Sequence, residues 1–219
     1  MNLFARITAI LCMLGCIGDF VLIFILGSHY PGYSQLHNTL SELGAPESPE
    51  TRIISNWWIV LGALYVLFGI SIGLNYSGAD KLVKWIVWLI IIYALGECFG
   101  SGIIPIQRVN GQLNAMGKLH DALGGVGIAA IMVLPYVLIR MFSKADFPAY
   151  NLFLWILLIA GPVFLILFSI AKILNNPDNF FVLYKGLWQR LLSLNYYLVL
   201  MSIAVRVLFY EKVFVHIVR

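Results

Sequence analysis

Charged residues are scarce in this sequence. Lys, Arg, Asp and Glu make up 11% of its 219 residues, whereas an ordinary soluble domain contains about 25%. Hydrophobic residues make up 61%, and the mean hydropathy is +0.91. This balance excludes a soluble globular domain and a disordered chain. It predicts a single integral membrane domain over residues 1–219.

Paired cysteines and nucleic-acid-binding signatures are also missing. Cys12, Cys16 and Cys98 all lie in apolar runs, and no CxxC motif occurs. Such cysteines behave as small hydrophobic residues, so a disulfide-stapled secreted module is excluded. The net charge of +4 comes from basic residues scattered at segment ends, which argues against nucleic acid as a partner.

Six apolar segments are each long enough to cross a bilayer whose hydrocarbon core is about 30 Å thick. Pro, Gly, Ser and Asn residues punctuate the gaps between them. We therefore predict an all-α bundle of six transmembrane helices, multi-pass in the cell membrane. The predicted spans are Leu3–Leu26, Asn56–Leu74, Lys84–Ile104, Gly117–Met141, Tyr150–Leu174 and Leu187–Tyr210.

The positions of Lys and Arg predict the orientation of the bundle. With both termini in the cytoplasm, the cytoplasmic side carries eight of these residues and the outer side carries six. The first connection, which is then outside, holds three glutamates and one arginine. Because positive residues favour the cytoplasmic side, we expect both termini to be cytoplasmic.

Residues 27–55 form the one long connection, and long ordered loops in compact proteins are usually functional. Ser34 is placed to cap a short amphipathic helix from Gln35 to Leu43, which Gly44 would end. One face of that helix would carry Leu36, Leu40 and Leu43, and the other would pair His37 with Ser41 and Asn38 with Glu42. The helix is expected on the membrane surface or over the mouth of the bundle.

The loop also carries a family resemblance. The runs Tyr30-Pro31-Gly32-Tyr33-Ser34 and Ser41-Glu42-Leu43-Gly44 resemble the signature of a bacterial membrane family known as domain of unknown function 998. The resemblance implies a short polytopic bundle over most of the chain. It also implies an acidic residue in the first helix and a histidine near the start of a later one, which His120 matches. Ile106-Gln107 stands where an acidic residue is expected, which weakens a metal centre there.

Ionisable side chains at membrane depth are costly, so each one is a candidate functional group. Asp19 is expected roughly 10 Å below its helix end and Glu97 about 12 Å, at a rise of about 1.5 Å per residue. Four helices and the long loop place polar groups at this same outer depth. Within the helices these groups are Asp19, Glu97, His120, Asp121, Arg190 and Asn195. They predict an outward-facing polar pocket.

Several chemistries remain open for this pocket. The catalytic candidates are Asp19, Glu97, His120 and Asp121, and the substrate-binding candidates are Tyr33, Ser34, His37, Ser41, Glu42, Arg190 and Asn195. Arg190 would pair with one carboxylate, while another would act as general base together with His120. Zinc held by histidines and carboxylates stays open although no HExxH spacing occurs. A serine nucleophile beside His37 is the weaker hypothesis, since there is no nucleophile-elbow motif.

The depth of the pocket suits a substrate whose polar group lies at the membrane interface. We therefore expect a hydrolase or transferase acting on a lipid or lipid-linked headgroup. The alternative is a non-catalytic binder or transporter of a lipid or small molecule. Paired haem-binding histidines and convincing internal repeats are absent from the spans. Membrane lipids are the expected partners, self-association is left open, and no cofactor or metal is assigned.

Overall fold

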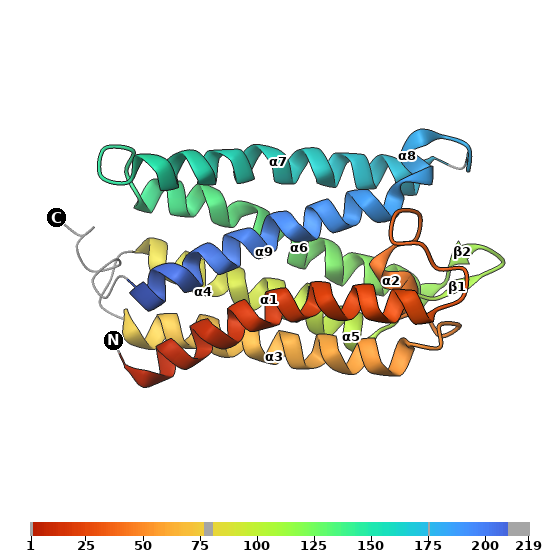
Figure 1. Ribbon diagram of the computed structural model, residues 1–219, viewed down its shortest axis with the longest axis horizontal. Helices are drawn as coiled ribbons and strands as arrows, with labels where there is room; N and C mark the ends of the chain where they lie inside the picture. Colours follow the sequence, from red (N-terminus) through yellow and green to blue (C-terminus); the bar gives the residue numbers. More distant parts are fainter. Residues whose placement is uncertain (1, 77–80, 175, 210–219) are drawn as a thin grey trace.

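Six long helices lie side by side in the computed structural model, which describes residues 2–76, 81–174 and 176–209 (Figure 1). They are α1 (Leu3–His29), α3 (Thr51–Asn75), α4 (Lys81–Tyr93) with its continuation through η1 (Ala94–Phe99) and α5 (Gly100–Ile103), α6 (Ala115–Met141), α7 (Pro148–Ile173) and α9 (Lys185–Phe209). Each is long and apolar enough to cross a membrane. The predicted six-span all-α bundle is therefore confirmed.

The helices close into a ring in chain order. α1 packs on α3, α3 on α4, α4 on α6, α6 on α7, α7 on α9, and α9 returns to α1. Tyrosines fill much of the interior: Tyr65, Tyr93, Tyr196 and Tyr197 are all buried. A bundle of this kind satisfies its backbone hydrogen bonds within each helix, as the bilayer interior requires.

The shorter elements gather at one end of the ring, which we call the loop end. They are α2 (Leu40–Leu43), the strands β1 (Arg108–Val109) and β2 (Gln112–Leu113), and α8 (Phe180–Leu183). In Figure 1 they lie on the right, whereas α1 begins and α9 ends on the left. The β1–β2 turn has positive φ at Asn110 (50°) and Gly111 (78°), the conformation that favours an Asn-Gly pair.

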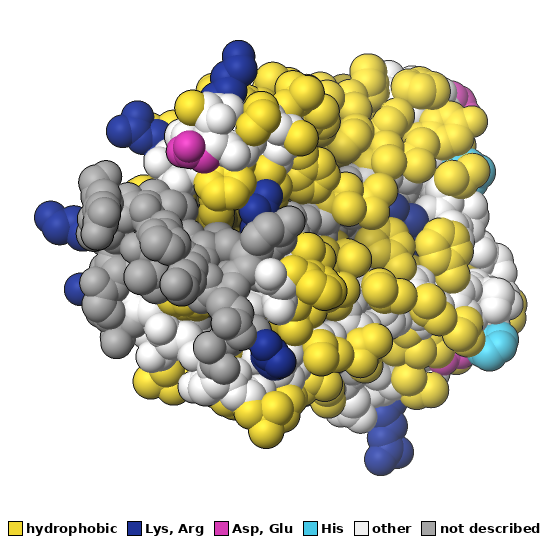
Figure 2. Space-filling model, turned by 60° about the vertical axis from the view of Figure 1, so that its left-hand side comes forward, with side chains coloured by type: hydrophobic (Ala, Val, Ile, Leu, Met, Phe, Trp, Pro, Cys, Tyr) yellow, Lys and Arg dark blue, Asp and Glu magenta, His cyan; other side chains and the backbone are white. Residues whose placement is uncertain are grey.

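Large apolar side chains cover the flank of the bundle. Ile159 is 62% exposed, Trp88 61% and Val126 58%, values that a soluble protein would avoid in such number. Figure 2 shows hydrophobic side chains over most of this flank, with the histidines and most of the charged side chains toward the two ends. The chain is thus a multi-pass membrane protein whose flank faces lipid.

Helix boundaries differ from the prediction mainly at the first turns. Helices α3, α4, α6, α7 and α9 begin two to five residues earlier than expected. Hydropathy misses the polar first turn of a helix, although N-cap residues stabilise it. In α6, for example, Asn114 Oδ1 accepts the Gly117 N–H at 2.9 Å. The predicted last-span end, Tyr210, lies outside the described residues.

The predicted helix from Gln35 to Leu43 is largely wrong. Only Leu40–Leu43 is helical, Thr39 is its N-cap in place of Ser34, and Gly44 ends it as expected. Glu42 accepts the Thr39 N–H at 3.2 Å.

Contacts with helix α9 explain why residues 35–39 do not form the predicted first turn of this helix. Leu187 donates its N–H to the Leu36 carbonyl at 3.0 Å, and Arg190 donates to the Asn38 carbonyl at 2.9 Å. These carbonyls therefore bond across to α9 rather than along a helix of their own. As a result Leu36 is 45% exposed, and only Leu40 and Leu43 form the buried face.

Candidate functional site

Arg190 fastens the long loop onto the bundle. Its Nε donates to Gln35 Oε1 at 2.9 Å, and its Nη1 donates to the carbonyls of Asn38 (2.9 Å) and Gly186 (3.0 Å). Its Nη2 donates to the Tyr33 hydroxyl at 2.7 Å and again to Gln35 Oε1. All five N–H groups of the guanidinium are thus in use. Arg190 therefore does not pair with a buried carboxylate, and it keeps no free donor for a substrate.

His120 and Ser41 meet where α2 covers the end of α6. His120 Nδ1 lies 2.7 Å from the carbonyl oxygen of Ile104, and Nε2 lies 3.1 Å from Ser41 Oγ. A carbonyl oxygen only accepts hydrogen bonds, so Nδ1 must carry the proton. In the neutral ring Nε2 then holds the lone pair, and the Ser41 hydroxyl donates to it. This is the arrangement of a serine nucleophile with its general base.

The end of the third membrane span, helix α5, supplies the carbonyl that orients His120. Helix α5 ends at Ile103 because Pro105 follows, and proline disfavours a helical conformation in the residue before it. Carbonyls in the last turn of a helix lack partners within that helix. The Ile104 carbonyl, just beyond that end, is therefore available to fix the His120 tautomer. It takes the orienting place that a carboxylate holds in a catalytic triad.

A cavity of about 160 Å³ opens beside this pair, between α6 and α7. Its walls include Ser41, Glu97, His120, Asp121, Lys172 and Gln189. A second cavity of about 20 Å³, room for about one water molecule, lies deeper and is lined by Asp19. Ser41, Glu97 and Gln189 line both. Three of the four predicted catalytic residues thus share one cavity, and Asp19 lines its neighbour.

Asp19 is bonded to two neighbouring helices. Its carboxylate accepts from Trp57 Nε1 of α3 at 2.9 Å and from the Tyr197 hydroxyl of α9 at 2.6 Å. The residue is 1% exposed. Satisfied hydrogen bonds are what make a polar group tolerable at this depth, so Asp19 holds α1, α3 and α9 together.

Glu97 lies in the π-helical segment η1, a geometry often found at functional sites. Glycines let α6 approach it closely: a Cβ at Gly124 would lie 2.7 Å from Glu97 Oε2, and one at Gly127 would lie 2.6 Å from the Glu97 backbone nitrogen. No residue in the described ranges donates a hydrogen bond to its carboxylate. Glu97 therefore stands at the junction of the two cavities with its acceptors free for water or a ligand.

Asp121 is not a free base. Its carboxylate pairs with Lys172 Nζ at 2.8 Å, which joins α6 to α7 at the cavity wall. The side chains are 27% and 36% exposed, and such partly exposed ion pairs contribute little to stability. The Asp121–Lys172 pair, however, places two charged groups in the wall of the cavity that Ser41 and His120 line.

Other predicted residues lie away from the Ser41–His120 pair. The predicted His37–Ser41 pairing is wrong, because exposed His37 packs edge-on against Tyr184 at 5.7 Å between ring centroids. Asn195 donates to the Leu157 carbonyl at 3.1 Å, so it joins α9 to α7. Ser34 lies in the turn before α2, where its carbonyl accepts from the backbone of the following residues.

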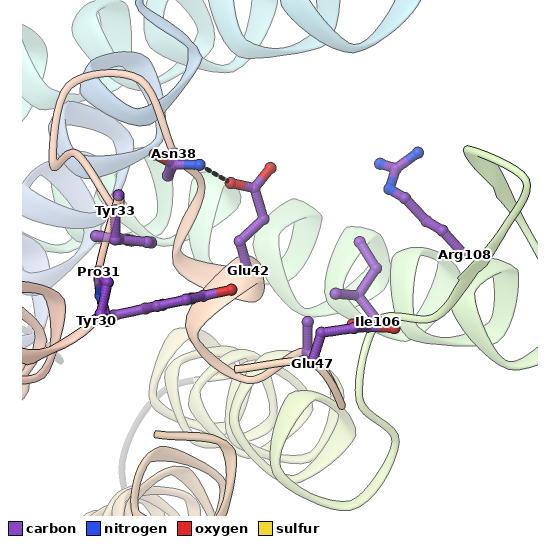
Figure 3. Close-up of a pocket in the computed structure, with 10 residues that line it drawn as sticks. Tyr30, Pro31, Tyr33, Asn38, Glu42, Glu47, Ile106 and Arg108 are labelled. Atoms are coloured by element: carbon purple, nitrogen blue, oxygen red, sulfur yellow. Dashed lines mark hydrogen bonds between the residues drawn. The ribbon is translucent and has the colours of Figure 1, made fainter. Parts of the chain in front are cut away.

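Tyr33 and Glu42 line a separate pocket of about 390 Å³ at the loop end (Figure 3). Burial raises the pKa of Tyr33 to about 12, so this hydroxyl stays protonated and donates to the Thr39 carbonyl at 3.0 Å. Figure 3 shows Glu42 bonded to Asn38, with Arg108 across the pocket. Glu42 also pairs with Lys185 Nζ at 2.6 Å.

Gln189 is a site residue that sequence reasoning missed. It is buried, and its Oε1 accepts the Leu40 N–H at 2.7 Å. That bond fixes the orientation of the amide and leaves Nε2 without a hydrogen bond to any residue the structure describes. Since Gln189 lines both cavities, it brings an unused donor to the site. A neutral polar side chain within a predicted span was the available signal.

Metal ligands do not converge in the described part of the chain. No three His, Cys, Asp or Glu side chains there are grouped as a metal site would require. His29 and His37 are both exposed at the surface, while the Nε2 of His120 is occupied by Ser41. The residues brought together are those of acid–base and nucleophilic chemistry.

These features define a class: a six-span integral membrane protein whose loop end holds a polar cavity beneath a covering loop. The family model described as "Protein of unknown function (DUF998)" matches residues 13–206. The chain therefore belongs to this family, as the loop motif indicated. The match includes all of the residues around Ser41 and His120 described above. No curated protein and no solved structure matches the chain significantly.

Proposed function

We propose that the protein is a membrane serine hydrolase or acyltransferase that acts on an ester of a lipid or lipid-linked molecule. The observation that carries the proposal is the Ser41–His120–Ile104 chain of hydrogen bonds. The tautomer that this chain fixes leaves Nε2 able to take the Ser41 proton. Hydrolase chemistry was expected from the carboxylates, and the geometry favours the serine instead.

The reaction follows from these positions. Ser41 Oγ attacks the ester carbonyl carbon as its proton passes to His120 Nε2, and the imidazolium is held by the Ile104 carbonyl. The oxyanion that forms would accept from Gln189 Nε2, which shares the cavity lining with Ser41. Collapse breaks the bond to the leaving alcohol, which takes the proton from His120 and leaves an acyl ester on Ser41. Water, or a second alcohol in a transferase, then attacks that ester and gives its proton to His120. The Ser41 Oγ–acyl bond breaks, Oγ takes the proton back from His120, and the free acid or the new ester is released.

The α6–α7 seam supports a substrate from the bilayer. Gly124 and Gly125 contribute no side chains there, and a Cβ at Gly125 would meet nothing within 4 Å. Gly125 is exposed, and the neighbouring Val126 is 58% exposed on the lipid-facing flank. A lipid could therefore reach Ser41 sideways through this seam without leaving the membrane.

The membrane side of the site forms part of the proposal. Both ends of the described chain lie opposite the loop end (Figure 1). If the termini are cytoplasmic in the cell membrane, as the Lys and Arg distribution predicts, the cavity serves the outer leaflet. Membrane lipids are then its partners.

A fluorophosphonate probe tests the nucleophile without knowledge of the substrate. We expect the full-length protein in lipid nanodiscs to be labelled, with the adduct mapped to Ser41 by peptide mass spectrometry. Ser41→Ala should abolish labelling, whereas Ser34→Ala, in the same loop but away from His120, should keep it. Failure of the folded wild type to label, or labelling that persists in Ser41→Ala, would contradict the proposal and favour a non-catalytic binder or transporter.

A further inference from the structure

A vestibule of about 370 Å³ adjoins the Ser41 cavity at the loop end. Ser41 and Lys172 line both spaces, so the vestibule leads directly to the proposed nucleophile. The remaining walls come from Thr39 and α2, from β1 and the residues before it, from the end of α7, and from α8 and the start of α9. Apart from Ser41 itself, no residue given a role in the serine chemistry lines this space.

Positive charge is concentrated in the vestibule. Arg108, Lys172 and Lys185 line it, against one carboxylate, that of Glu42. Lys185 is paired with Glu42, and Lys172 with Asp121, which lies outside this lining. The lining therefore carries an excess of cations.

Arg108 differs from the two lysines in its partner. Its Nη1 donates to the neutral Gly111 carbonyl at 3.2 Å, and no carboxylate within the described ranges forms an ion pair with it. The guanidinium keeps further N–H groups in a planar fork, the geometry that binds phosphate through two oxygens. Arg108 is exposed on the hairpin, so a ligand can reach it.

The three cations lie at or beyond the ends of the spanning helices, where the headgroup layer is expected. Lys172 is next to the last residue of α7, Lys185 is the first residue of α9, and Arg108 is in the connection between two spans. Basic side chains at helix ends reach toward the headgroup layer. On the α7 side the vestibule is apolar, with Phe168, Ala171 and Leu174, which suits the glycerol and upper acyl region of a lipid.

We propose that this vestibule binds the phosphate of an anionic phospholipid, with Arg108 as the principal ligand and Lys172 and Lys185 completing the positive surface. Headgroup binding stands independently, while the further step, in which it places an ester beside Ser41, rests on the proposed function. The phosphate at the vestibule would thus select the lipids that reach the nucleophile.

Native mass spectrometry of the full-length Ser41→Ala protein tests binding in the absence of turnover. The protein in detergent is offered phosphatidylglycerol, phosphatidylcholine or inorganic phosphate in separate titrations. We expect retention of phosphatidylglycerol well above phosphatidylcholine. A second change, Arg108→Gln, should weaken it about tenfold, as expected for loss of a hydrogen-bonded charged group. Arg108→Lys should lose less, because it keeps the charge but not the fork.

Lys118→Gln provides the matched control. It removes one exposed positive charge near the start of α6, also at the loop end. Lys118 lines neither the Ser41 cavity nor the vestibule. Equal retention of the two lipids, or equal losses in Arg108→Gln and Lys118→Gln, would overturn the proposal. So would binding of inorganic phosphate that depends on Arg108 without selective lipid retention, since the ligand would then be a soluble phosphate compound. Selective lipid binding without probe labelling of Ser41 would refute the serine chemistry and leave this site standing.

Discussion

The Ser41–His120 hydrogen bond can be tested by its coupling energy. Each partner is replaced by alanine alone and both together, and the free energy of unfolding is measured for the four proteins. His120→Ala removes two hydrogen bonds, to Ser41 and to the Ile104 carbonyl. At about 1 kcal/mol for each bond we expect a loss of about 2 kcal/mol. Ser41→Ala removes one of them, so the expected loss is about 1 kcal/mol.

The bond shared by the two single variants is lost only once in the double variant. The two single losses should therefore exceed the double loss by about 1 kcal/mol. Reversible unfolding in mixed detergent micelles, followed by tryptophan fluorescence, measures all four values. A parallel cycle of Ser41 with His37 should give no coupling, since His37 is exposed and packs against Tyr184.

The same variants separate structure from chemistry. General-base catalysis contributes between about 100-fold and 10,000-fold in rate, so His120→Ala should slow fluorophosphonate labelling of Ser41 within that range. His37→Ala should label at the wild-type rate. Additive stability losses for Ser41 and His120, or unchanged labelling in folded His120→Ala, would refute the assignment of the pair.

Three further outcomes are expected. Arg190→Lys cannot replace five N–H donors in a planar fork, so amide exchange in the loop should accelerate, and unchanged exchange would contradict the anchor. Gly127→Ala should lower the unfolding free energy by about 1–3 kcal/mol through overpacking, because its Cβ would lie 2.6 Å from a backbone nitrogen. Gly125→Ala, which meets open space, should not lower it. Glu47→Cys should react with an impermeant thiol reagent in intact cells, since the native cysteines are buried; protection would reverse the orientation.

Hydropathy was sufficient to predict the spans. A bilayer about 30 Å thick demands long apolar helices, and each predicted segment became one. The shared depth of Asp19, Glu97 and His120 was also informative, because polar groups at that depth must find partners or water. The structure accordingly places these groups around two adjoining cavities.

The partner of Ser41 could not be predicted from local spacing. His37 lies four residues away in the sequence, but helical spacing has no meaning where the chain is not helical, and α2 begins only at Leu40. His120 is 79 positions distant and reaches Ser41 because Arg190 and Gln189 hold the loop against α9. Tertiary hydrogen bonds thus override the local pattern that favoured a longer helix.

Depth along a helix does not specify which way a side chain faces, and α9 shows the consequence. Gln189 and Asn195 are both buried amides, yet at about 100° per residue they lie about 120° apart around the helix axis. Gln189 lines both cavities, whereas Asn195 bonds to α7 through the Leu157 carbonyl. Selecting residues by depth therefore could not separate Asn195, which lines neither cavity, from residues that do. The prediction left out Gln189, although the cost of burying an amide without partners follows from the same desolvation argument.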